Sequence, residues 1–97
     1  MRDDDFEWDD RKADENLVKH VVSFWLARRA FEHDRDWYEE PDPDPHEQRF
    51  NRLCAVMVED VEVVLAITYT ERGRRIRIIS AREATRHEQR TYDANRP

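Results

Sequence analysis

Three apolar segments between residues 49 and 80 constrain the fold of this chain most strongly. Arg49 to Glu59 and Arg75 to Ser80 alternate between apolar and polar residues, as strands with one buried face do. Between them, Glu62 to Thr70 is nearly continuous in Val, Leu, Ala and Ile, which is typical of a strand buried on both faces. The only glycine, Gly73, lies in the second short connection, where a tight hairpin needs it most. The sequence therefore predicts antiparallel strands joined by hairpins.

The remaining segments predict helices and short edge strands. Asp9 and Ser23 suit the N-cap positions of two helices, the first ending near His20 and the second covering residues 24–32. A third helix is predicted over residues 83–94. Residues 6–8 and 36–39 are long enough for edge strands only. We therefore predict an α+β fold: a small antiparallel sheet with two N-terminal helices and one C-terminal helix packed on one of its faces.

Length and composition indicate one domain over residues 1–97. Charged residues make up 41% of the chain, so the core must be concentrated in the few apolar segments. We expect residues 1–5 to be frayed. Residues 39–47 interleave three prolines with acidic residues, which predicts an exposed loop.

Targeting signals and cysteine usage indicate the compartment. The chain has no apolar run long enough to span a membrane and no pattern of a secretion signal. Its one cysteine, Cys54, cannot form an internal disulfide and is expected to be buried in a strand. These features predict a cytoplasmic protein that does not contact membranes.

The charge of the chain is divided unevenly between its two halves. Residues 1–47 hold 16 acidic and 7 basic side chains, a net charge of −9. Residues 48–97 hold 7 acidic and 10 basic side chains, a net charge of +3. The basic half could attract phosphates and the acidic half could hold a basic protein, although acidic side chains also simply solvate a surface.

Several arginines come from one strand-to-helix corner: Arg77, Arg82, Arg86 and Arg90. An arginine on an alternating strand is costly to bury unless its face opens on a groove or a partner. Converging guanidinium groups suit a polyanion such as RNA. This interpretation requires that the guanidinium groups form one open pocket that binds anions. It would fail if the side chains pointed to opposite sides, or if each were neutralised by its own carboxylate.

No motif predicts a cofactor. The chain has no phosphate-binding loop, no GxSxG, no CxxC and no HExxH. The four histidines lack metal-ligand spacing: His20, His33, His46 and His87. We therefore expect chemistry without a metal or cofactor.

Two separated blocks resemble the BrnT family, the small ribonuclease toxins of type II toxin–antitoxin pairs. FEWDDRKADENLVKHVVSF resembles the family's opening, roughly FxWDxxKxxxNxxKHGVSF, and ERGRRIRIISAREATRHEQRTY resembles its C-terminal half. The resemblance implies a RelE-like fold and a metal-independent endoribonuclease that cleaves RNA and inhibits translation. It also implies neutralisation by a BrnA-type ribbon-helix-helix antitoxin, with a dimer or a hetero-oligomer with the antitoxin as the assembly.

The polar positions that match the family suggest the site. They are Lys19, His20, Arg49, Arg72, Arg77, Ser80, Arg82 and Glu88. RNA cleavage by its own 2′-hydroxyl needs a base, an acid and cations around the phosphorane. We assign Lys19, His20, Arg77, Arg82 and Glu88 as catalytic candidates, and Arg49, Arg72, Arg86 and Arg90 as RNA-binding candidates. The matching positions do not say which residue is the base.

Structural alternatives exist for these candidates, and one position departs from the family. His20 could have the purely structural role of a helix cap, and Lys19 could be a solvated cation at a helix end. Glu88 lies six positions after Arg82 and is not expected to pair with it. The family usually has glycine after the matching histidine, where this chain has Val21. A β-branched residue adopts a left-handed conformation poorly, so we expect the turn to be made differently.

Three functions compete. The first is the toxin ribonuclease, which should degrade RNA in EDTA and lose that activity on Arg77→Ala or Arg82→Ala. The second is a non-catalytic interaction module whose acidic N-terminal half binds a basic protein; growth arrest at low dose would distinguish the enzyme from it. The third, a DNA-binding protein, is disfavoured by the overall charge of −6.

Overall fold

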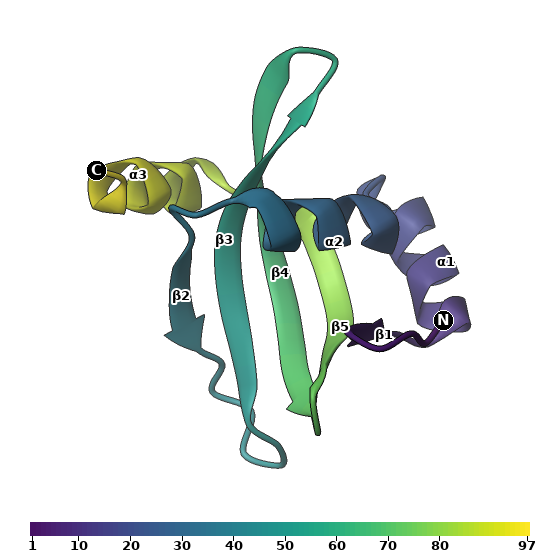
Figure 1. The fold of residues 1–97 in the computed structure, drawn as a ribbon. Helices are drawn as coiled ribbons and strands as arrows, with labels where there is room; N and C mark the ends of the chain where they lie inside the picture. Colours follow the sequence, from purple (N-terminus) through teal and green to yellow (C-terminus); the bar gives the residue numbers. More distant parts are fainter.

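The computed structural model describes residues 1–97 and confirms an α+β fold with three helices and five strands. Figure 1 shows the elements, which are β1 (Phe6–Glu7), α1 (Asp10–His20), α2 (Phe24–His33), β2 (Tyr38–Pro41), β3 (Arg49–Val58), β4 (Val61–Arg72), β5 (Arg75–Glu83) and α3 (Arg86–Asn95). None of the helices is long and apolar enough to cross a membrane.

The five strands form one sheet in the order β1-β5-β4-β3-β2. The β2–β3, β3–β4 and β4–β5 pairs are antiparallel, as the hairpin pattern predicts. β1 runs parallel to β5, with Phe6 opposite Ile76 and Glu7 opposite Arg77, so the sheet is mixed and the prediction of a purely antiparallel sheet is wrong. A hairpin sets the direction only of strands that it joins, and β1 and β5 are separated by most of the chain.

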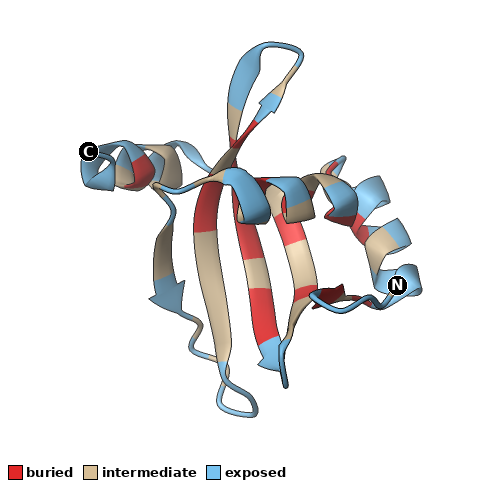
Figure 2. Ribbon diagram, viewed as in Figure 1, coloured by how far each residue is buried: buried red, intermediate tan, exposed pale blue.

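The helices do not share one face of the sheet, so that part of the prediction is also wrong. Phe24, Ala27 and Ala30 of α2 pack in the main core with the strand residues of one face. Tyr92 of α3 packs in a second cluster on the opposite face, with Leu53, Val64 and Ala66 as its buried neighbours. The central strand β4 is buried on both faces, as predicted, and Figure 2 shows the buried residues along it.

The helix starts follow the predicted caps. Asp9 accepts a hydrogen bond from the Lys12 amide at 3.0 Å, and Ser23 accepts one from the Leu26 amide at 3.0 Å. The third helix starts later than predicted, because Thr85 and Glu88 form a capping box and β5 continues to Glu83.

One other prediction is adjusted, and strand β3 carries a partly buried charge. The exposed loop begins after Pro41, because Tyr38–Pro41 pairs with β3 as an edge strand. Arg52, which interrupts the apolar face of β3, lies over the rings of Phe31 and Trp37, with its guanidinium carbon 3.9 and 4.0 Å from the ring centroids. The aromatic faces and the ion pair with Glu39 at 2.9 Å compensate the burial of this charge.

Asn16 closes the free edge of β5 beyond β1. Its buried side chain donates to the Ala81 carbonyl at 2.7 Å and accepts from the Ala81 amide at 3.1 Å. It also donates to the Val22 carbonyl at 2.9 Å. One side-chain amide therefore takes the place of a neighbouring strand and joins α1 to the sheet.

Val21 occupies the left-handed C-cap position that the sequence analysis judged unsuitable for it. Its φ is 58° and its ψ is 27°, and its amide donates to the Leu17 carbonyl. The expectation that the turn is made differently is therefore wrong. The chain keeps the backbone geometry of a glycine cap and accepts the steric cost of a β-branched residue.

Replacing Val21 with glycine should stabilise the protein by about 1 kcal/mol, because the left-handed conformation costs a non-glycine residue about 1–2 kcal/mol. The Val21 side chain is 82% exposed, so little packing is lost. Urea unfolding followed by tryptophan fluorescence measures the change. Val18→Gly is the matched control: Val18 is 85% exposed but helical, so glycine there should destabilise by roughly 0.3–0.5 kcal/mol. A loss of stability in Val21→Gly would contradict the argument.

Candidate functional site

A polar cleft lies between α3 and the sheet face opposite α2. It has a volume of about 410 Å³, a size typical of small-ligand sites. Strands β2 to β5 form its floor, and α3 forms one wall. Most of its lining residues are polar, and they are Tyr38, Glu40, Asp42, Asn51, Leu53, Ala66, Thr68, Ser80, Arg82, His87, Glu88 and Thr91.

A β-bulge in β5 places polar side chains of this strand on the cleft side of the sheet. Arg77 is opposite Thr70 and Ile78 is opposite Tyr69, but Ser80 is opposite Thr68 and Arg82 is opposite Ala66. Strict alternation would put Arg77 and Arg82 on different faces, since they are five positions apart. The extra residue at the bulge shifts the alternation, so Arg77, Ser80 and Arg82 share the cleft side of the sheet.

Arg82 and Glu88 form a two-pronged ion pair in the cleft. The Arg82 Nη1 and Nη2 atoms donate to the two Glu88 carboxylate oxygens at 2.6 and 3.0 Å. The expectation that these residues do not pair is wrong, because the capping box folds the Glu88 side chain back towards the start of α3 and the end of β5. The Arg82 hydrogen bond lowers the pKa of Glu88 to about 2, and Glu88 in turn raises the pKa of Arg82.

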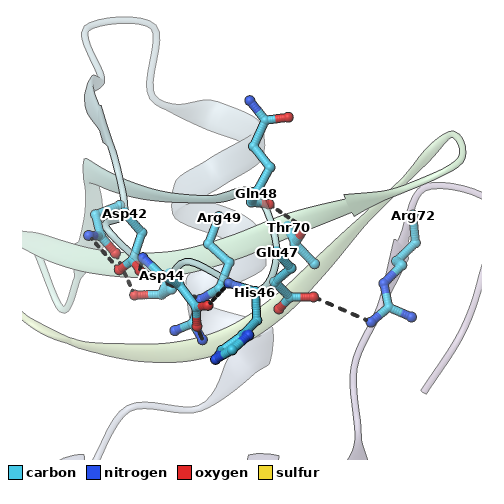
Figure 3. Close-up of polar contacts among 10 residues, drawn as sticks. Asp42, Asp44, His46, Glu47, Gln48, Arg49, Thr70 and Arg72 are labelled. Carbon is cyan, nitrogen blue, oxygen red and sulfur yellow. Dashed lines mark hydrogen bonds and ion pairs between the residues drawn. The ribbon is translucent and has the colours of Figure 1, made fainter.

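The other candidate arginines also have carboxylate partners. Arg77 donates to Glu7 at 2.7 Å. Figure 3 shows Arg49 beside Asp44, with Nη1 and Oδ2 3.0 Å apart, and Arg72 facing Glu47 across 3.8 Å. The prediction of an open pocket of unpaired guanidinium groups is therefore wrong for Arg77 and Arg82. The RNA-binding candidates Arg49 and Arg72 are paired as well.

Seven of the nine candidates do not line the cleft: Arg49, Arg72 and Arg77, described above, and four more. Arg86 and Arg90 are exposed, and helical spacing puts both on the side of α3 away from the buried Tyr92. Lys19 and His20 lie in the last turn of α1, which packs along β5, and they do not line the cleft. Of the nine predicted site residues, the cleft is lined by Arg82 and Glu88 only.

Sequence reasoning missed His87 as a site residue. It is exposed, and it lines the cleft with Arg82 and Glu88. The sequence signal for it is its position directly before Glu88, in the first turn of α3. Metal-ligand spacing, which the histidines lack, does not indicate it. Tyr38 and Asn51 were also missed, because β2 and β3 bring them to the cleft from distant parts of the sequence.

The cleft combines a fixed cation, an imidazole and several neutral hydrogen-bonding groups. Glu88 stays ionised at neutral pH, and a carboxyl group with a pKa of about 2 is a weak base. A histidine imidazole can accept or donate a proton near neutral pH. Arg82 can hold a phosphate with the fork that now holds Glu88. No group of three or more His, Cys, Asp or Glu side chains is placed to hold a metal ion.

Comparison with known proteins gives one family. Residues 8–88 match the model of a family described as the ribonuclease toxin BrnT of type II toxin–antitoxin systems. The match covers the strands that form the cleft floor and ends at Glu88 in the first turn of α3, before the lining residue Thr91. No curated protein matches the chain.

Proposed function

Because this chain belongs to the BrnT family of type II ribonuclease toxins, we propose that it is a metal-independent endoribonuclease whose reaction takes place in the cleft beside α3. One observation carries the choice of site: Arg82 and His87 line the same polar cleft. The nine candidates drawn from the sequence do not form one cationic cluster, so the support comes from the family and this cleft.

RNA binds when its phosphates take the places of the carboxylates that are paired with the arginines. Glu40, Asp42 and Glu88 also line the cleft, and Arg82 becomes available to a phosphate only when Glu88 leaves it. A phosphate that takes the place of Glu88 at Arg82 gains the same two-pronged contact, while Glu88 keeps its hydrogen bond from the Thr85 amide at 2.8 Å. The same exchange at Arg49 and Arg72 would extend the RNA contact along the sheet.

The proposed reaction is transfer of the phosphoryl group within the RNA. The 2′-oxygen forms a bond to the adjacent phosphorus as its proton passes to a base, and the bond from phosphorus to the 5′-oxygen breaks as that oxygen receives a proton. The products are a 2′,3′-cyclic phosphate and a 5′-hydroxyl. His87 is our candidate for a proton transfer, and Arg82 stabilises the charge on the phosphorane oxygens.

The test is RNA cleavage by the purified protein in EDTA. We expect labelled RNA to be cut to fragments ending in a 2′,3′-cyclic phosphate, and an all-deoxy oligonucleotide to remain intact. His87→Ala should lower the rate at least about 100-fold, since positioned proton transfer contributes about 10²–10⁴. His46→Ala, in the exposed loop, is the matched control and should keep the wild-type rate.

His20→Ala separates the two histidine assignments. A large loss in His20→Ala with an unchanged rate in His87→Ala would move the chemistry to the end of α1, where Lys19 and His20 lie. Cleavage of the all-deoxy oligonucleotide would refute attack by the 2′-hydroxyl.

The proposed partner is a BrnA-type ribbon-helix-helix antitoxin, and the RelE-like fold is part of the same proposal. A second candidate, a non-catalytic module that binds a basic protein, is favoured by one observation: Arg49, Arg72, Arg77 and Arg82 are all paired with carboxylates. Such a module would leave RNA intact, and cells would tolerate its expression, whereas the toxin should arrest growth at low dose.

A further inference from the structure

Exposed apolar side chains gather where α1 meets α2. Leu17, Val18, Val21 and Trp25 are 46%, 85%, 82% and 57% exposed. In a chain with 41% charged residues, such a patch on one corner indicates a contact with another molecule. This corner is separate from the cleft beside α3, with which it shares no lining residue.

The corner is hollowed as well as apolar. A groove of about 230 Å³ lies between the two helices, with Leu17 and Trp25 at its edge and Trp8, Ala13 and Phe24 among its other lining residues. Trp25 is held in place by an edge-to-face contact with Trp8, at 4.8 Å between ring centroids. The groove can therefore receive an apolar ridge without first rearranging its walls.

Val21 supplies an independent argument for an external contact. Its left-handed backbone is strained for a β-branched residue, and glycine would relieve that strain. Its side chain is mostly exposed and so contributes little packing within the chain. A residue that costs stability without contributing to the core is expected where function requires its side chain.

The charge around the groove indicates the occupant. Asp10 and Asp14 line it and follow the same side of α1 as Leu17 and Val21, one to three turns away. Asp10 accepts a hydrogen bond from the N-terminal amine at 2.9 Å, whereas Asp14 is exposed and has no ion-pair partner. A bound segment would therefore place apolar side chains beside Val21 and a cation beside Asp14.

We propose that this α1–α2 groove is the docking site for an amphipathic helix of a basic protein partner, with lysine or arginine beside its apolar stripe. A groove between two helices that is apolar and flanked by carboxylates suits the apolar face of such a helix. The identification of this partner with the antitoxin rests on the proposed function; the docking site does not.

The test uses a designed amphipathic helix of about 18 residues, roughly five turns, with leucines on one face and lysines on the other. Its binding to the full chain is followed by tryptophan fluorescence. We expect Val21→Asp to weaken binding at least about tenfold, because it places a carboxylate in the apolar contact. Met57→Asp is the matched control: Met57 is 53% exposed on the β3–β4 hairpin, and the change of net charge is the same. It should leave the affinity within about twofold.

Three outcomes overturn the proposal. Unchanged or tighter binding in Val21→Asp would mean that charge alone attracts the peptide, because an added carboxylate favours a lysine-rich helix. Equal binding of a helix with glutamates in place of the lysines would show that the groove does not select a basic partner. A concentration-dependent dimer of the chain alone, broken by Val21→Asp in sedimentation, would make a second copy the occupant. RNA cleavage is not the readout, so failure of the ribonuclease proposal leaves this result interpretable.

Discussion

Replacing Arg82 with alanine should lower RNA cleavage at least about 100-fold, because removal of one group that stabilises transition-state charge typically costs about 10²–10³ in rate. Arg82 is the only arginine that lines the cleft, and its guanidinium presents two parallel N–H groups there. Without it, no fixed cation in the cleft would face the phosphorane. Initial rates on labelled RNA in EDTA measure the effect.

Arg86→Ala is the matched control for this prediction. It removes the same charge from the same part of the chain, but Arg86 is exposed and lies outside the cleft. Arg82→Lys keeps the charge and loses the fork, so we expect an intermediate rate. The helix should persist in Arg82→Ala, because the capping box of Thr85 and Glu88 does not involve Arg82.

Equal rates for Arg82→Ala and Arg86→Ala would show that the reaction does not take place in this cleft. Arg77→Ala adds a second comparison. Arg77 shares the sheet face with Arg82 but is paired with Glu7 and does not line the cleft. A loss in Arg77→Ala alone would move the site along β5 towards β1.

Asn16→Leu should have the largest effect on stability, a loss of about 3–5 kcal/mol. The change leaves three buried backbone groups without partners: the Ala81 amide, the Ala81 carbonyl and the Val22 carbonyl. Each unsatisfied buried group costs about 1–3 kcal/mol, although neighbouring losses are not fully additive. For a domain of this size the melting temperature should fall by roughly 12–25 °C.

Asn95→Leu provides the control for that measurement. Asn95 is also a helical asparagine, but it is exposed, and its single side-chain hydrogen bond goes to the Thr91 carbonyl of the same helix. Its replacement should change the free energy of unfolding by less than about 0.5 kcal/mol. If urea unfolding gives similar values for Asn16→Leu and Asn95→Leu, the edge of β5 does not depend on Asn16.

The starts of the first two helices and the three long strands could be predicted because their causes are local. Asp9 and Ser23 cap amides three positions away, and the hairpin at Gly73, with a φ of 60°, depends on its own backbone. The two-sided burial of β4 also follows from its continuous apolar run. At Val21 the same local reasoning failed, because the sequence shows what a residue prefers and not what strain the rest of the fold imposes.

The candidate site could be predicted only in part. Arg82 and Glu88 were both chosen, but their ion pair was not expected, since it requires a strand end and a capping box that meet in space. His87 was not predicted, because its position beside Glu88 does not show whether its side chain faces a cleft. Arg86 and Arg90 were chosen for proximity in sequence, which does not determine the side of a helix that faces the sheet.

Local patterns along the chain were sufficient to establish its class of fold, most of its strands and helix caps, and its resemblance to a toxin family. The packed fold alone decided which faces α2 and α3 cover, where the bulge in β5 turns Arg82, and which carboxylate meets each arginine. The physical reason is the range of the interactions. A cap or a hairpin involves residues a few positions apart, whereas Arg77 and Glu7 are separated by 70 positions and Asn16 and Ala81 by 65.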